Sequence, residues 1–254
     1  MYLLTTLLAG FLLMAYVSSD SLAAELPALQ ILDRADDKWD LNLKNSTVEL
    51  ELLVYRETKL RKTYRILLKY QDTAHVLAET TFPPRNEGEK MLQAGRRNFW
   101  LFLPNINRAM RISESNSLSN SDFSNTDLLS PRLSDEYVPQ LLGTEKLRDD
   151  ETYKLELTAK DESTPYARII YWIRKADYFP LRRDYYTFSQ QLLKRLDMKS
   201  STPPVKGMPE GMPDIFVMSS VLERDKKTVI RYLKYTPGPA FPPETFSENA
   251  LMKR

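Results

Sequence analysis

The sequence contains no cysteine, one histidine and few glycines. The absence of cysteine excludes disulfides and zinc–thiolate sites, and it also excludes a lipid-modified cysteine of the kind that anchors lipoproteins. Only 7 glycines occur, and neither a Gly-x-x-x-x-Gly-Lys nor a Gly-x-Gly-x-x-Gly motif is present, which argues against a glycine-rich phosphate-binding loop. We therefore predict no bound cofactor and a fold that an apolar core alone must stabilise.

Residues suited to catalysis are also scarce. His75, the single histidine, follows a polar turn where a strand is predicted to begin, which is typical of a surface or edge residue. A Ser-His-acid triad would need this histidine, and the chain has no Gly-x-Ser-x-Gly motif to supply the serine. The acidic run at 149–151 lacks the spacing of a calcium-binding loop. We expect a protein that is not an enzyme and holds no metal.

Neither sign of charge dominates, and only one long hydrophobic run occurs. The 36 Lys and Arg are scattered among 34 Asp and Glu, so the net charge of +2 predicts no nucleic-acid partner. Residues 2–17 carry no charge, and small and polar residues follow them. As a helix this run would span about 24 Å, less than the ~30 Å of a bilayer core. It predicts a cleaved secretory signal at 1–24; an uncleaved anchor is the alternative, because no Lys or Arg precedes the run.

The periodicity of apolar residues predicts one mainly β domain over residues 25–254. An amphipathic helix is expected at 26–40, and short helices are expected at 126–137 and 243–251. Elsewhere apolar and polar residues alternate in about eleven segments at hairpin spacing. The predicted strands are 47–54, 64–70, 75–82, 98–103, 108–113, 153–158, 167–174, 181–188, 191–198, 215–223 and 227–235.

A single sheet of this width must curl or split. We expect a strongly curved antiparallel sheet that forms an incomplete β-barrel, an α+β fold in which helices cover the concave side. The polar segment 113–125 is either a solvated linker or, like the first helix, a part that moves as a lid. Ser124 followed three residues later by Asp127 is typical of a helix capping box.

Residues 99–103, Phe-Trp-Leu-Phe-Leu, break the alternation. A strand with one wet face alternates apolar and polar residues, so both faces of this strand are expected to contact apolar groups. One interpretation is that it packs against helices on one face and against a neighbouring element on the other. The second is that its inner face lines a cavity that protein fills only partly. Periodicity alone does not distinguish these two interpretations.

Several stretches of the chain resemble a known family. The strongest pieces are an aromatic-x-aromatic-x-Pro motif with two arginines after it, in NFWLFLPNINRAMRI, and Ser-Asp-Phe followed by Asp-Leu, in SDFSNTDL. Over most of residues 26–250 the sequence resembles the outer membrane lipoprotein-sorting-protein-like family. This is an uncharacterised branch of bacterial periplasmic proteins similar to the lipoprotein carrier LolA. The similar stretches are 80–92, 98–112, 117–129, 137–158 and 169–186.

The resemblance implies a periplasmic carrier that holds an acyl chain of a lipid or lipoprotein in an apolar half-barrel cavity under a helical lid. Members of the family often accompany RND-type exporters, so the alternative is a non-catalytic accessory or sensory subunit of such an inner-membrane exporter. The expected partners are the lipid or lipoprotein cargo and an inner-membrane transporter, and the chain is expected to be a monomer. The side chains predicted to bind lipid are Leu50, Leu52, Tyr64, Ile66, Leu68, Phe99, Trp100, Leu101, Phe102, Leu155, Tyr171 and Phe216.

Two further features allow a functional and a plain structural interpretation. Arginines around 99–103 would either meet anionic lipid headgroups at the barrel mouth or form a solvated rim. Met208 and Met212, in a repeated Gly-Met-Pro, would be either an exposed, adaptable contact surface or part of an ordinary loop. The arginines concerned are Arg96, Arg97, Arg108 and Arg111.

Overall fold

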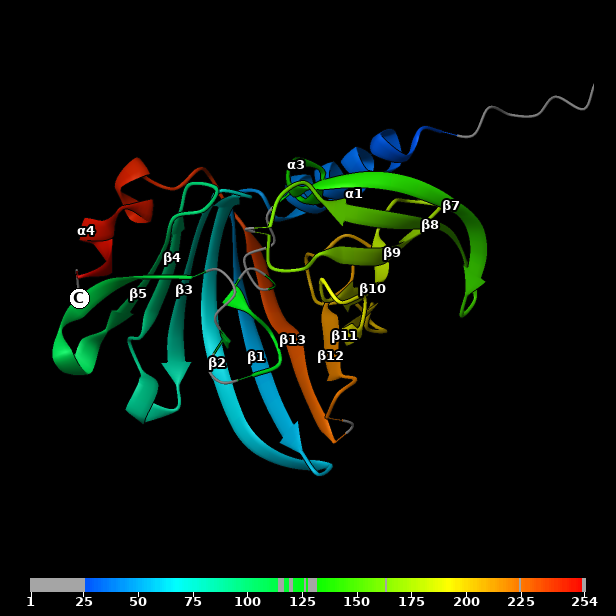
Figure 1. The fold of residues 1–254 in the computed structure, drawn as a ribbon. Helices are drawn as coiled ribbons and strands as arrows, with labels where there is room; N and C mark the ends of the chain where they lie inside the picture. Colours follow the sequence, from blue (N-terminus) through cyan, green and yellow to red (C-terminus); the bar gives the residue numbers. More distant parts are fainter. Residues whose placement is uncertain are drawn as a thin grey trace, which may run out of the picture.

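The computed structural model describes residues 26–113, 117–118, 121–125, 127, 132–162, 164–223 and 225–252. The predicted signal at 1–24 lies outside these residues. Within them, thirteen strands pair antiparallel in one sheet with the order β6-β5-β4-β3-β2-β1-β13-β12-β11-β10-β9-β8-β7. The sheet is strongly curved, and its edge strands β6 and β7 do not pair with each other (Figure 1). The predicted incomplete barrel is therefore confirmed.

The first six strands form one wing of the sheet. In β1 the alternation predicted from sequence puts Val48, Leu50 and Leu52 on one face, each with an exposed fraction of 0%. Short 3-10 turns that begin at prolines follow β3 and β5. The elements of this wing are β1 (Ser46–Arg56), β2 (Lys59–Asp72), β3 (His75–Phe82), η1 (Pro84–Asn86), β4 (Lys90–Ala94), β5 (Phe99–Leu103), η2 (Pro104–Ile106) and β6 (Arg108–Ile112).

The remaining seven strands form the second wing, which returns to the first. The last strand pairs with β1 from Ser46 opposite Pro237 to Arg56 opposite Lys226. This pairing joins the two meanders into one sheet (Figure 1). The strands are β7 (Tyr137–Leu147), β8 (Asp150–Ala159), β9 (Arg168–Arg174), β10 (Pro180–Tyr186), β11 (Leu192–Lys199), β12 (Ile215–Ser220) and β13 (Lys226–Pro237).

The sequence analysis does not predict β4 and β7. The first has only five residues, too few for an alternating pattern to stand out. The second contains Pro139, which lacks an N–H donor, and Gly143, which has a φ of 129° at a bulge. An edge strand tolerates both, because one of its sides needs no ladder hydrogen bonds. Within the helix predicted at 126–137, the structure shows Asp127 in helical conformation and α3 (Leu133–Glu136), and residues 126 and 128–131 lie outside the described residues.

The helix predicted at 26–40 is confirmed as α1 (Ala28–Leu43), which lies across the concave side of the sheet (Figure 1). Its residues Ile31, Leu32 and Ala35 share one face and are at most 1% exposed, because they pack into the core of the half-barrel. The short helix α3 contacts both α1 and β7. No helix in the described part of the chain is long and apolar enough to cross a membrane.

The C-terminal helices lie on the other face of the sheet. The sequence predicts a helix at 243–251, and the structure has η4 (Pro243–Phe246) and α4 (Glu248–Leu251) there. These two elements contact β3 and β4 from outside, whereas the prediction puts all helices on the concave side. The reason is that β3, β4 and β5 also have apolar side chains on their outer face, which the C-terminal segment covers.

Candidate functional site in the concave interior

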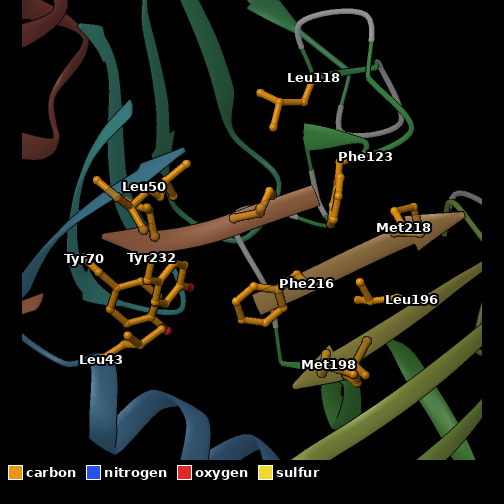
Figure 2. Packing of buried hydrophobic residues seen from close by; sticks show 14 of the residues in the cluster. Leu43, Leu50, Tyr70, Leu118, Phe123, Leu196, Met198, Phe216, Met218 and Tyr232 are labelled. Carbon is orange, nitrogen blue, oxygen red and sulfur yellow. The ribbon is translucent and has the colours of Figure 1, made fainter. Parts of the chain in front are cut away.

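The concave face of the sheet carries one large apolar cluster to which strands of both wings contribute. Because strand side chains two residues apart share a face, each strand supplies several members. Figure 2 shows part of the cluster, in which Leu43 of α1 lies near Leu50 and Tyr70, with Tyr232 and Phe216 beside them. Of the predicted lipid-binding residues, the cluster contains Leu50, Leu52, Tyr64, Ile66, Leu68, Phe99, Leu155, Tyr171 and Phe216.

The apolar strand β5 has its two faces in different surroundings. Phe99 belongs to the interior cluster, and Leu101 lines a hollow on that side. Trp100 and Phe102 lie on the outer face, so they do not contribute to the concave interior. The strand thus packs against helices on one face and borders an incompletely filled space on the other. The partners on the outer face are Leu77, Leu92, Phe246 and Leu251.

We call residues 113–132, between the edge strands β6 and β7, the crossing segment, and its described residues 117–118 and 121–125 contribute to the cover of the interior. Among its described residues, Leu118 and Phe123 have exposed fractions of 7% and 2% and belong to the interior cluster (Figure 2). They share this cluster with residues of α1 and with strand residues such as Leu155, which is fully buried. In this conformation the protein's own side chains therefore occupy most of the concave space.

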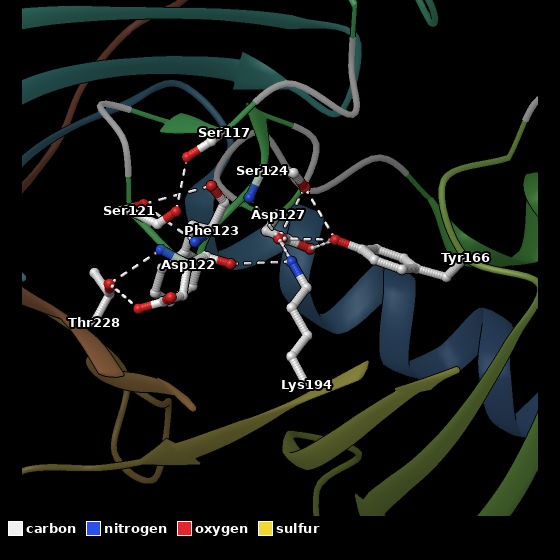
Figure 3. A network of polar contacts seen from close by, with 9 residues as sticks. All are labelled: Ser117, Ser121, Asp122, Phe123, Ser124, Asp127, Tyr166, Lys194 and Thr228. Carbon is white, nitrogen blue, oxygen red and sulfur yellow. Dashed lines mark hydrogen bonds and ion pairs between the residues drawn. The ribbon is translucent and has the colours of Figure 1, made fainter. Parts of the chain in front are cut away.

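Asp127 anchors the crossing segment from within. Its side chain is 1% exposed, and its carboxylate forms an ion pair with Lys194 Nζ of β11 at 2.7 Å. Ser124 donates to the same carboxylate from its backbone N–H at 2.7 Å and from its hydroxyl at 2.8 Å. The first bond is one half of the predicted capping box, and the Asp127 backbone N–H donates to the Ser124 carbonyl oxygen instead of to its hydroxyl. The Tyr166 hydroxyl donates to Asp127 at 3.1 Å (Figure 3). One cation and three hydrogen bonds thus compensate this buried charge.

Asp122 anchors the segment to the sheet at a second point. Its carboxylate accepts a hydrogen bond from the Thr228 hydroxyl at 2.7 Å and forms an ion pair with Arg56 at 3.0 Å. Its carbonyl oxygen accepts a hydrogen bond from Lys194 Nζ at 3.1 Å (Figure 3). The described part of the crossing segment is therefore not a solvated linker. It is an ordered insertion in which polar contacts surround two buried apolar side chains.

A hollow of about 200 Å³ remains between the first wing and the crossing segment. Ile66, Met91 and Leu101 form its apolar wall on the sheet, and Leu118 lines it from the crossing segment. A second hollow, of about 30 Å³, lies beside Phe123. The smaller one fits a small polar group but no acyl chain. A long apolar guest thus needs the space that the crossing segment fills.

Arg183 of β10 faces the interior between Tyr171 and Leu196, its neighbours on the adjacent strands. Its Nη2 donates to the Tyr171 hydroxyl at 2.9 Å, and the guanidinium carbon lies 4.6 Å from the centroid of the Tyr171 ring. The sequence analysis does not identify this residue. Its position is nevertheless readable from the sequence, because period-two alternation puts Arg183 on the same face as the apolar Tyr185. A permanent cation therefore lies inside a mainly apolar chamber.

Asp36 of α1 brings a carboxyl group to the same region. It is 7% exposed and accepts a hydrogen bond from the Ser134 backbone N–H at 2.8 Å. Burial raises the pKa of the Asp36 carboxyl from 3.8 to about 6, and the hydrogen bond from Ser134 and the charge of Arg183 offset that effect only in part. This carboxyl group therefore titrates within the protein at mildly acidic pH.

The four arginines around β5 have different surroundings. Arg96 forms an ion pair with Asp135 at 2.8 Å, and Arg97 pairs with the neighbouring glutamate of α3. These contacts tie the β4–β5 turn to α3, across the opening between the two wings. Arg108 and Arg111 of β6 are exposed. Contact with lipid headgroups stays a prediction for this rim.

Met208 and Met212 are buried, with exposed fractions of 8% and 2%, and they belong to the interior cluster. The interpretation as an exposed contact surface is therefore wrong. Gly207 and Gly211 have φ values of 87° and 76°, in the left-handed region that favours glycine. The turns that these glycines allow return both methionine side chains to the core.

His75 begins β3, as predicted, and its side chain is 41% exposed. Its Nδ1 lies 2.9 Å from a carboxylate oxygen of Asp72. No group of three or more metal-ligating side chains occurs in the part of the chain that the structure describes.

Comparison with known proteins gives one matching family model and several solved structures with the same fold. A family model described as an uncharacterized protein matches residues 72–253. No curated protein matches the sequence. A LolA superfamily protein from Nitrosomonas europaea has a TM-score of 0.76 at 23% identity, with 89% of this chain and 100% of that chain covered.

Two further solved structures have similar scores. A putative outer membrane lipoprotein-sorting protein domain from Vibrio parahaemolyticus has a TM-score of 0.78 at 21% identity, covering 89% of this chain and 98% of that one. A DUF1329 family protein from Desulfovibrio piger has a TM-score of 0.74 at 24% identity, covering 89% and 100%. At these identities the likeness is one of fold. The family model covers most of the chain, so the chain belongs to that family of uncharacterized proteins, and over nearly its whole length it shares the fold of LolA superfamily and outer membrane lipoprotein-sorting proteins.

Proposed function

We propose that the protein is a periplasmic carrier that holds an acyl chain of a lipid or lipoprotein in the concave interior of its half-barrel. The observation that carries the proposal is the way in which this interior is closed. Two buried side chains of the crossing segment, Leu118 and Phe123, fill it, and they belong to a segment held largely by polar contacts. The fold shared with lipoprotein-sorting proteins supports the same conclusion.

The task requires an apolar lining rather than a catalytic group. Carrying an acyl chain of about 14 carbons through water forfeits ~0.8 kcal/mol for each CH₂, or roughly 10 kcal/mol in total. The interior strands supply the lining, with Leu50, Leu52 and Ile66 on the first wing and Leu155 on the second. Their present contacts are with other apolar side chains, which an acyl chain of similar polarity would replace.

When the cargo binds, its acyl chain replaces the crossing segment in the concave interior. The crossing segment leaves the interior, and Phe123 and Leu118 give their places to the cargo. The contacts that hold the segment at Asp122 and Asp127 are ion pairs and hydrogen bonds, which water replaces when they open. The hollow of about 200 Å³ beside Leu118 provides the space from which the exchange starts.

The proposal includes a location in the periplasm and a transporter partner in the inner membrane. The secretory signal expected at 1–24 would deliver the chain to the periplasm, where the absence of cysteine is no handicap. A carrier of this kind works as a monomer that receives its cargo at the inner membrane, from a transporter. His75 has no role in the mechanism.

The direct test is extraction of lipids from protein purified under mild conditions, followed by mass spectrometry, together with displacement of a fluorescent fatty acid. We expect co-purified acyl lipids and saturable displacement. Protein that is folded by circular dichroism but yields neither result would contradict the carrier function.

The extent to which protein fills the interior favours one alternative, a non-catalytic accessory or sensory subunit of an inner-membrane RND-type exporter. In that case the crossing segment is a permanent part of the core, and the outer surface contacts the exporter. Capture of an exporter from membranes by the tagged protein, without any bound lipid, would favour this alternative over the carrier.

A further inference from the structure

Two buried N–H groups inside the half-barrel have no hydrogen-bond acceptor among the residues that the structure describes. They are Nε of Arg183 and Nε1 of Trp39. Buried donors in native proteins are nearly always paired. Two unpaired donors in one chamber therefore need an explanation.

The two donors belong to walls of the same space. Both side chains line the hollow of about 30 Å³ beside Phe123, and both also line a smaller one beside Asp36. Trp39 comes from α1, and its ring packs edge-on against Phe216 at a centroid distance of 5.7 Å. Arg183 comes from β10 and is fixed by its hydrogen bond to Tyr171. Both donors are thus held in place before any ligand enters.

The charge of Arg183 is not neutralised by an ion pair with any described residue. Asp36 faces it across the smaller hollow without forming one. Asp127 lines the 30 Å³ hollow, but its carboxylate is already paired with Lys194. A guanidinium keeps its charge at every physiological pH. An anion that enters the chamber would therefore gain a cationic partner without displacing another anion.

We propose that Arg183 and Trp39 bind the anionic group of an amphiphilic cargo, so that the carrier selects amphiphiles with a carboxylate or phosphate over neutral lipids. This inference rests on the proposed carrier function. The Nε–H of Arg183 and the Nε1–H of Trp39 each offer one hydrogen bond to an oxygen of the anion. The wall beyond them is apolar, with Leu196, Phe216 and Ile230, and it gives the tail a path toward the place of Phe123.

The test compares dodecanoate with dodecanol at pH 7.5, through displacement of N-phenyl-1-naphthylamine, an uncharged fluorescent probe. We expect the acid to bind at least about tenfold more tightly than the alcohol, since hydrogen bonds to a charged group are worth that much or more. In Arg183→Met this preference should disappear while dodecanol affinity changes less than about threefold. Trp39→Phe keeps the ring and removes the N–H, and it should lower the preference in part. Acetate should not displace the probe.

A matched control comes from the same strand. Arg182 lies on the opposite face, where it pairs with Asp197 at 2.8 Å, so Arg182→Met should leave the preference unchanged. If dodecanoate and dodecanol bind wild-type protein equally, the carrier function stands and this inference is overturned. If neither binds the folded protein, both fail. A preference that survives in Arg183→Met, a preference that Trp39→Phe leaves at the wild-type value, or displacement by acetate alone also overturns the inference.

Discussion

The sheet has two apolar faces at β3, β4 and β5, and they differ in what covers them. On the outer face, Leu77, Leu92 and Phe102 are sealed by Phe246 and Leu251 of the C-terminal helices, which lie close along the sheet. On the inner face, the cover is the polar crossing segment, and the chamber behind it contains hollows, a buried arginine and unpaired donors. Apolar residues alone thus do not mark a ligand chamber. Incomplete filling and unpaired polar groups do.

The largest expected effect on stability comes from a residue that anchors the inner cover, the crossing segment. Asp127→Ala leaves Lys194 without its buried partner, which costs roughly 3–5 kcal/mol of stability. The same change loosens the crossing segment, so acyl-probe binding should become tighter although the protein is less stable. Chemical denaturation and a probe titration measure the two effects. Weaker probe binding in a folded Asp127→Ala protein would mean that the segment supports the cargo instead of competing with it.

A matched pair of leucines tests the two faces directly. Leu50 of the inner face and Leu92 of the outer face both have an exposed fraction of 0%, so truncation of either to alanine should cost ~2–5 kcal/mol. Only Leu50→Ala should change the affinity for an acyl probe, because only Leu50 borders the chamber. Equal effects of the two variants on probe affinity would remove the distinction between the faces.

Asp36 makes the stability of the inner side depend on pH. Its carboxyl pKa is about 6 in the folded protein, above its value of ~3.9 in an unfolded chain, so the folded state binds this proton more strongly. The stability from this group is complete below about pH 4 and falls as the pH rises through 6, by up to ~3 kcal/mol. Asp36→Asn should therefore gain stability relative to wild type between pH 4.5 and 7, measured by denaturation at each pH. A constant difference across that range would contradict the assignment.

The smallest effect on stability is expected for the exposed arginines around β5. Arg96 and Asp135 have side chains that are 61% and 41% exposed, and exposed ion pairs contribute about 0–1 kcal/mol. Arg96→Ala should shift the melting temperature little and leave acyl-probe affinity unchanged. Loss of binding in this variant would instead indicate that the rim contacts the cargo headgroup.

Local patterns in the sequence predict which side chains lie on the inner face of a strand. They do not predict which element packs against that face. Alternation identifies Leu50 and Leu52 as inward, and the uninterrupted β5 correctly indicates contact on both faces. The element that covers Trp100 and Phe102 comes from residues 241–251, far along the chain, and no local pattern encodes that contact. For the same reason the burial of Met208, in a loop rich in proline, is not visible in the sequence.

The sequence pattern places a polar residue in the interior, but the sequence analysis does not predict it. Arg183 occupies an inward position in phase with Tyr185, opposite the inward Tyr171. A charged residue in an inward register departs from the alternation and points to a functional role. The crossing segment shows the opposite case. Its serine-rich composition is typical of a linker, whereas Asp122 and Asp127 anchor it through partners more than 60 residues away in sequence.

Entry of an acyl chain into the concave interior can be measured with the native tryptophans. Trp39 lines the chamber, whereas Trp100 packs on the outer face. Two variants that retain one of them each, both with Trp172→Phe, are titrated with a fatty acid brominated in mid-chain, which quenches tryptophan on contact. We expect strong, saturable quenching of Trp39 and little quenching of Trp100. Equal quenching of both, or quenching of Trp100 alone, would contradict it.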